Sequence, residues 1–238
     1  ETGSGSTSSN AFISRISDLE RLIYRTVERL RKQPFRESRP TSSSLRNAFD
    51  IYLSVPRGGS FTITVQVGKQ LMLPGLDDSD QVIDEIMECL TLINSKNEFE
   101  LKNRINDESY YKNFIGLAKR IAPDGTKINL VGLTSIRSGN EKQLPFTRKR
   151  SDFSIVKSDT DKNGDNKTIT VQGVLLFADN TQRNGKIKIR TIDHKEFDII
   201  VPTGMMADIV RPLWENEVVI VGQKKKNSII LQDISKAE

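Results

Sequence analysis

The ten residues SDTDKNGDNK, numbers 158–167, have the composition of a calcium-binding loop. Carboxylates, an amide and a turn glycine stand at the first positions of an EF-hand pattern, as Asp159, Asp161, Asn163, Gly164 and Asp165. The twelfth position is Thr170 instead of a bidentate glutamate, and the eighth, usually apolar, is Asn166. The flanking segments have β patterns, not helical ones. Because a tight turn needs the same residue types, we interpret this stretch as a joint before a final domain, with weak calcium binding as the alternative.

Residues suited to catalysis are few. His194 is the only histidine and lies at an expected strand connection, where a turn explains it better than a general base. The only cysteine, Cys89, falls inside an apolar helical pattern, which indicates a buried structural thiol and allows no internal disulfide. One histidine and one cysteine cannot build a zinc site of the usual kind.

Carboxylates also cluster at the start of an expected helix. These residues are Asp77, Asp78, Asp80, Asp84 and Glu85. Capping and the helix dipole explain them, with magnesium binding as the alternative. We therefore predict that the protein is not an enzyme and has no catalytic residue, no metal and no cofactor.

The best candidate for function is electrostatic. In GKIKIRTI, residues 185–192, isoleucines alternate with cations, so one strand face enters the core and the other carries Lys186, Lys188 and Arg190. A second basic group, Lys224, Lys225 and Lys226, lies in an expected loop between strands. In a small barrel the two groups flank one groove and can bind nucleic-acid phosphates. The alternative is that these cations only keep the barrel soluble and protect its edges.

A further basic stretch, TRKRS, precedes the expected barrel and, with Arg137, adds Arg148, Lys149 and Arg150. It extends a phosphate-binding track, or docks on an acidic helix surface of this chain or of a partner. Aromatic residues for base stacking are scarce in the C-terminal part, which has Phe177, Phe197 and Trp214. Phe197 and Trp214 fit a core equally well.

Periodicity predicts an α+β domain over residues 11–157. Apolar residues at helical spacing predict an amphipathic helix from Phe12 to Lys32, capped by Ser9 or Asn10. Basic residues occupy much of its remaining surface: Arg15, Arg21, Arg25, Arg29 and Lys32. The other expected elements are strands at 45–55 and 60–68 joined by a Pro-Arg-Gly-Gly hairpin turn, helices at 82–93 and 108–121, and strands at 127–136 and 144–156.

The last part of the chain, residues 168–238, predicts a small barrel. Three strand patterns, a short helix and two more strand patterns follow one another, as KTITVQGVLLFAD, GKIKIRTI, KEFDIIVP, GMMADIVRPLW, EVVIVG and SIILQDI. This is the element order of a five-stranded OB-type barrel, because the helix stands between the third and fourth strands. An SH3-like barrel is the alternative.

The chain resembles an uncharacterised group of bacterial proteins. The resemblance rests on GGSFTITV, VQGVLLFAD and NEVVIVGQKKKNSIILQDI. It implies a helical and β N-terminal part followed by a small β-barrel, and it carries over no activity.

Composition bounds the remaining expectations. The 238 residues fit two domains, with 1–10 a tag or linker and 158–167 a linker between the domains. No apolar run approaches a membrane span, and the single cysteine fits a reducing compartment, so we expect a cytoplasmic protein with no membrane contact.

The net charge of +5 is unevenly distributed. Residues 11–40 have 8 basic and 4 acidic side chains, whereas residues 76–110 have 3 basic and 10 acidic ones. Two hypotheses follow. The first is a non-enzymatic protein whose barrel contacts a nucleic-acid backbone. The second is a protein–protein adaptor or accessory subunit, for example of a bacterial defence system, with the amphipathic and acidic helices as contact faces.

Overall fold

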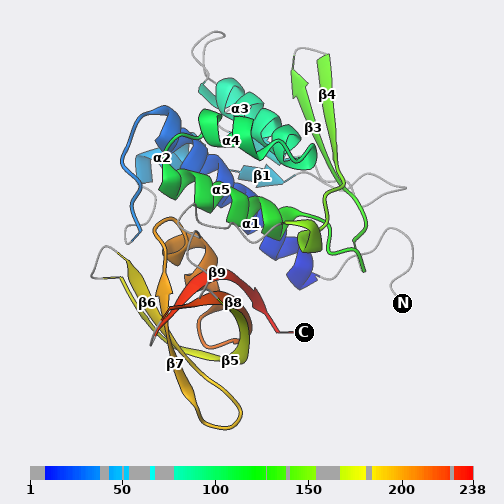
Figure 1. Ribbon diagram of the computed structural model, residues 1–238. Helices are drawn as coiled ribbons and strands as arrows, with labels where there is room; N and C mark the ends of the chain where they lie inside the picture. Colours follow the sequence, from blue (N-terminus) through cyan, green and yellow to red (C-terminus); the bar gives the residue numbers. More distant parts are fainter. Residues whose placement is uncertain are drawn as a thin grey trace. The chain divides into compact units, whose positions relative to one another are not determined.

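The computed structural model describes residues 9–37, 43–49, 51–53, 65–67, 78–126, 128–137, 140–153, 167–180, 184–225 and 228–237. The fold is α+β, as the sequence predicts, and it divides into two compact units (Figure 1). No helix of the described residues has the length and apolar character needed to cross a membrane. The calcium-like stretch 158–166, the Pro-Arg-Gly-Gly turn and Lys226 lie outside the described residues.

The first unit contains most of the helices. Its elements are α1 (Ser9–Leu30), α2 (Ser43–Ala48), β1 (Ile51–Leu53), β2 (Val65–Val67), α3 (Asp78–Asn94), α4 (Glu98–Arg104), β3 (Val131–Arg137), β4 (Asn140–Phe146) and a short 3-10 turn, η1 (Arg150–Asp152). Helix α5 (Glu108–Ile121) is shared, because residues up to Gly116 group with the second unit and those from Leu117 with the first.

Helices α1 and α3 build the core of the first unit. The spacing of apolar residues that predicts these helices is also the spacing that buries Leu22, Ile23 and Val27 of α1, and Leu90 and Ile93 of α3. Both helices are therefore confirmed, and their apolar faces are used inside the unit.

The polar face of α1 is more buried than the sequence suggests. Arg25 is buried and pairs with Glu28 of the same helix at 2.9 Å. Asp18, with a fully buried side chain, accepts hydrogen bonds from Arg21 at 2.8 Å and from Arg120 of α5 at 3.0 Å. The prediction that Arg25 lies on the surface is wrong, because an opposite charge at helical spacing allows it to be buried.

The β elements of the first unit differ from the prediction where they are described. Residues 45–48 belong to helix α2 and not to a strand, and Ile51–Leu53 form strand β1, which pairs antiparallel with β2. The expected strand at 127–136 is β3, and the next strand, β4, begins at Asn140 and ends at Phe146. Helix α4 was not expected; Asn97 caps it by accepting a hydrogen bond from the Glu100 amide at 3.3 Å.

The second unit is built on a five-stranded barrel. Its strands are β5 (Thr168–Asp179), β6 (Gly185–Arg190), β7 (Glu196–Val201), β8 (Glu217–Lys225) and β9 (Ser228–Lys236). They close in the order β5-β6-β7-β9-β8, with β8 pairing back to β5. All the pairs are antiparallel except β7 with β9. Leu175, Ile187, Ile189, Ile199 and Ile220 fill the barrel interior.

Between β7 and β8 the chain forms a π-helical turn, η2 (Met206–Val210), and a 3-10 turn, η3 (Arg211–Leu213), instead of the expected short regular helix. Two other parts of the chain are joined to this connection. Glu37 accepts hydrogen bonds from the Gly204 and Ala207 amides, and the Asn113 amide donates to the Gly204 carbonyl at 2.9 Å and to Asp208 at 3.0 Å. The second unit therefore includes residues 35–37 and Asp107–Gly116 as well as the strands.

The backbone of β6 comes close to Gly173 of β5. A β-carbon on Gly173 would lie 2.5 Å from the Arg190 carbonyl oxygen of β6. We expect Gly173→Ala to lower the free energy of unfolding by about 1–3 kcal/mol, because two backbones must move apart. Urea denaturation followed by circular dichroism measures this loss.

Gly132→Ala in β3 is the matched control, since nothing lies within 4 Å of its added carbon. Its unfolding midpoint should stay near that of the wild type. Equal losses in the two variants would contradict the close-approach explanation.

Candidate nucleic-acid interface

The predicted cations of β6 lie on the outside of the barrel. Gly185, Ile187 and Ile189 are buried, whereas Lys186 and Arg190 are exposed and Lys188 is intermediate. Alternation along a strand forces this arrangement once the isoleucines enter the core.

The neighbouring strands add a different kind of side chain on each side of β6. On β5, Val174 lies opposite Arg190 and Phe177 lies opposite Lys188. On β7, Glu196 lies opposite Arg190 and Asp198 lies opposite Lys188. Beside Lys188 and Arg190 the outer face is therefore apolar on β5 and anionic on β7, whereas Lys186 lies between Asp179 of β5 and Ile200 of β7.

Glu196 pairs with two of the three cations. Its carboxylate lies 2.8 Å from Arg190 Nη2 and 3.1 Å from Lys188 Nζ. These hydrogen bonds, first from Arg190 and then from Lys188, lower the pKa of Glu196, and the bond to Glu196 raises the pKa of Lys188. Lys186 is exposed and lies opposite Asp179 of β5. The column of three cations therefore has less net positive charge than the sequence alone suggests.

The second basic group lies on the same sheet, farther around the barrel. Lys225 pairs with Ser228, and the next residue of β9, Ile229, pairs with Ile199 of β7. Asp198, the residue before Ile199, lies opposite Lys188. One row therefore crosses β6, β7, β9 and β8, through Lys188, Asp198, Ser228 and Lys225. Three strand spacings separate the two lysines, about 14 Å along the sheet. Lys224 and Lys225 are exposed.

The basic stretch before the barrel has another role. Arg148 is buried, and its guanidinium donates to the Ile93 carbonyl at 2.9 Å and to the Asp152 carbonyl at 3.1 Å. Arg150 donates to the carbonyls of Ala122 and Arg120, and burial, followed by the charge of Arg15, lowers its pKa. Lys149 between them is exposed. Both guanidiniums bind backbone carbonyls of the first unit, so we leave Arg148 and Arg150 out of the proposed interface.

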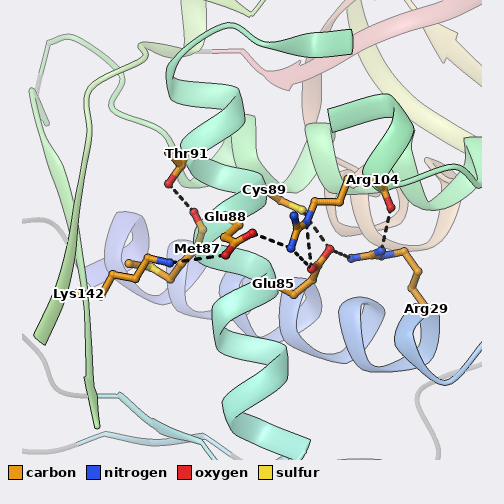
Figure 2. Close-up of polar contacts among 8 residues, drawn as sticks. All are labelled: Arg29, Glu85, Met87, Glu88, Cys89, Thr91, Arg104 and Lys142. Atoms are coloured by element: carbon orange, nitrogen blue, oxygen red, sulfur yellow. Dashed lines mark hydrogen bonds and ion pairs between the residues drawn. The ribbon is translucent and has the colours of Figure 1, made fainter. Parts of the chain in front are cut away.

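Two carboxylates of the acidic helix α3, Glu85 and Glu88, have basic partners within their own unit (Figure 2). Glu85 accepts hydrogen bonds from Arg29 of α1 at 2.5 Å and from Arg104 of α4 at 2.7 Å. Glu88 pairs with Arg104 at 2.7 Å and with Lys142 of β4 at 3.9 Å. Burial raises the pKa of Glu85, but the hydrogen bonds and charges of Arg104 and Arg29 outweigh it and hold the pKa below its ordinary value.

Of the two residues considered for catalysis, Cys89 is buried in α3 and His194 lies in a turn. Cys89 is buried beside Glu85, and burial followed by that negative charge raises the pKa of its thiol to about 12. His194 is exposed in the β6–β7 turn, with a left-handed backbone at φ 60°. No group of three or more His, Cys, Asp or Glu residues that can hold a metal occurs among the residues described.

The sequence analysis includes Phe177 among the aromatic residues for base stacking but does not predict the strand irregularity that turns it outward. Its side chain is 49% exposed, although strict alternation from the buried Leu175 places it inside. The signal was the run Val174-Leu175-Leu176-Phe177-Ala178, which is too long to alternate between core and solvent. Phe197 lies opposite the buried Ile189, on the inner face, and Trp214 is 40% exposed after η3.

No family model matches the chain, and no curated protein matches it at a significant level.

We expect Arg148→Ala to lower the free energy of unfolding by about 2–3 kcal/mol, because the carbonyls of Ile93 and Asp152 lose a buried donor. Lys149→Ala, one residue away and exposed, should change it by less than about 0.5 kcal/mol. Urea titration of both variants measures the difference. A larger loss for Lys149→Ala would contradict the structural role of Arg148.

Glu85→Gln should destabilise the protein by about 2–3 kcal/mol at pH 7, because Arg29 and Arg104 lose their shared carboxylate. The folded-state pKa of Glu85 is lowered, so its contribution is complete above the ordinary value of 4.5 and disappears as pH falls through the folded pKa. The gap between wild type and variant should therefore narrow below pH 4.5 in urea titrations. The exposed Glu141→Gln is the control, and a pH-independent gap would contradict the assignment.

Proposed function

We propose that the protein is a non-enzymatic nucleic-acid-binding protein that contacts the sugar-phosphate backbone through the outer face of β6 and the end of β8. The observation that carries this proposal is the outward column Lys186, Lys188 and Arg190 on β6. Regularly spaced cations on a rigid strand suit a polyanion, because each can meet a phosphate without base-specific contacts.

The barrel topology supports an OB-type assignment, which we include in the proposal. The strand order β5-β6-β7-β9-β8 and the parallel pair β7–β9 suit it, as does the π and 3-10 connection between the third and fourth strands. In OB folds the second and third strands, with the loop between the fourth and fifth, bind oligonucleotides. Here those parts are β6, β7 and the loop after Lys225, so the cationic column falls on the face that such folds use.

Each cation has a role in this proposal. Lys186 is exposed opposite Asp179, and Lys224 and Lys225 extend the basic surface about 14 Å around the sheet. We include Lys226 in the same loop from the sequence alone. Lys188 and Arg190 must exchange Glu196 for a phosphate, which is feasible because exposed ion pairs are weak.

The adaptor reading stays a hypothesis with less support. The apolar face of α1 packs within the first unit, and Glu85 and Glu88 of α3 already have arginine partners there. This apolar face and these two carboxylates are therefore already used in contacts inside the first unit.

The test is salt-titrated fluorescence anisotropy with labelled 20-nucleotide DNA and RNA, single- and double-stranded. Replacing Lys186, Lys188 and Arg190 by Gln should weaken binding and reduce the slope of log K against log salt by about 2 for single strands. Glu196→Gln should strengthen binding, because it releases two cations without adding charge elsewhere.

The control removes the same charge from the first unit, through Gln at the exposed Lys32, Lys96 and Lys102. This triple variant should bind nearly as well as the wild type. If no nucleic acid binds at low salt, or if the two triple variants lose affinity equally, the proposed interface is wrong.

A further inference from the structure

An irregularity in β5 puts Phe177 on the outside of the barrel. Leu175 is fully buried and pairs with Ile189, whereas Phe177 pairs with Lys188, the next residue back along β6. One extra residue, Leu176, therefore lies between two consecutive cross-strand pairs, which is a β-bulge. A bulge shifts the parity of the strand, so Phe177 joins the outer face instead of the core.

The result is an aromatic ring directly beside a cation. Phe177 is 49% exposed and lies opposite Lys188, and the exposed Val174 lies opposite Arg190. Directly opposite residues on one sheet face have β-carbons about 5 Å apart. An apolar side chain and a positive charge thus lie one strand spacing apart. This separation is comparable to the distance between a base and its own phosphate.

Acidic residues on β7 determine which side a ligand of Lys188 and Arg190 takes. Glu196 lies opposite Arg190 and Asp198 lies opposite Lys188. A phosphate on β6 is repelled from β7, and the rest of its nucleotide is directed toward β5, where Phe177 and Val174 lie.

We infer that the ligand is an unpaired, single-stranded nucleic acid, with a base stacked on Phe177 and adjacent phosphates on Lys188 and Arg190. This inference rests on the proposed function and narrows its ligand class. A duplex keeps the faces of its bases inside the stack, so only an unpaired base can cover the Phe177 ring. Stacking on an aromatic ring is independent of sequence, so little sequence preference is expected.

The experiment measures the affinity of the 238-residue chain for three labelled probes. These are a 12-nucleotide oligo(dT), the same oligomer with abasic sites throughout, and a duplex of equal length. The variants are Phe177→Ala, Phe177→Trp and the control Phe99→Ala. Phe99 is 79% exposed on α4 between Glu98 and Glu100, so it is an exposed ring in acidic instead of basic surroundings.

We expect Phe177→Ala to weaken oligo(dT) binding about fivefold or more, and Phe177→Trp to retain or improve it. Affinity for the abasic oligomer and the duplex should change little with Phe177→Ala, since neither offers a free base. Phe99→Ala should bind every probe like the wild type.

The outcomes separate the two claims. If oligo(dT) and the abasic oligomer bind equally, and Phe177→Ala changes neither, the stacking inference is wrong while backbone binding stands. If the duplex binds best and is the probe weakened by Phe177→Ala, the assignment to single strands is wrong. If no probe binds at low salt, the proposed function itself fails.

Discussion

Closure of the β5–β9 sheet gives every residue of its strands an inside or an outside position. In a closed sheet the inner face fills with side chains, and here Leu175, Ile187, Ile189 and Ile199 occupy it. The residues between them must face solvent, whatever their type. The column of Lys186, Lys188 and Arg190 is a consequence of this parity, because each follows or precedes a buried isoleucine or glycine.

A different constraint governs the first unit, where charge pairing decides what remains on the surface. The arginines of α1 and α4 meet the carboxylates of α3, and Asp18 of α1 meets Arg120 of α5. Segments that carry opposite charge along the chain therefore neutralise each other in space. The same principle explains Arg148, whose guanidinium replaces solvent for two backbone carbonyls and Glu98. A basic run in a sequence is thus poor evidence for a basic surface unless its burial is known.

Periodicity in the sequence predicts most of the helices and strands, but it does not predict which residues pair between strands. The helices α1, α3 and α5 and the five barrel strands follow from spacing, because burial of one face imposes that spacing on each element. Three features did not follow. The short helix α2 replaced part of a strand, Glu196 came to lie across from Arg190, and a bulge moved Phe177 outward. The last two depend on the register between strands, which no single strand's pattern contains.

The bulge that places Phe177 is tied to the shape of the barrel itself. Strand β5 pairs with β8 from Thr168 to Val174 and with β6 from Val174 to Asp179, so it must bend to serve two neighbours. Gly173, at the change of partner, lets the β6 backbone approach closely, and the bulge at Leu176 adds the local twist that closure requires. Without the bulge, Phe177 would lie on the inner face and β5 would also lose its bend. The exposed ring beside Lys188 is therefore a product of the same distortion that closes the barrel. A small fold can in this way place an aromatic residue on its surface without losing a residue from its core.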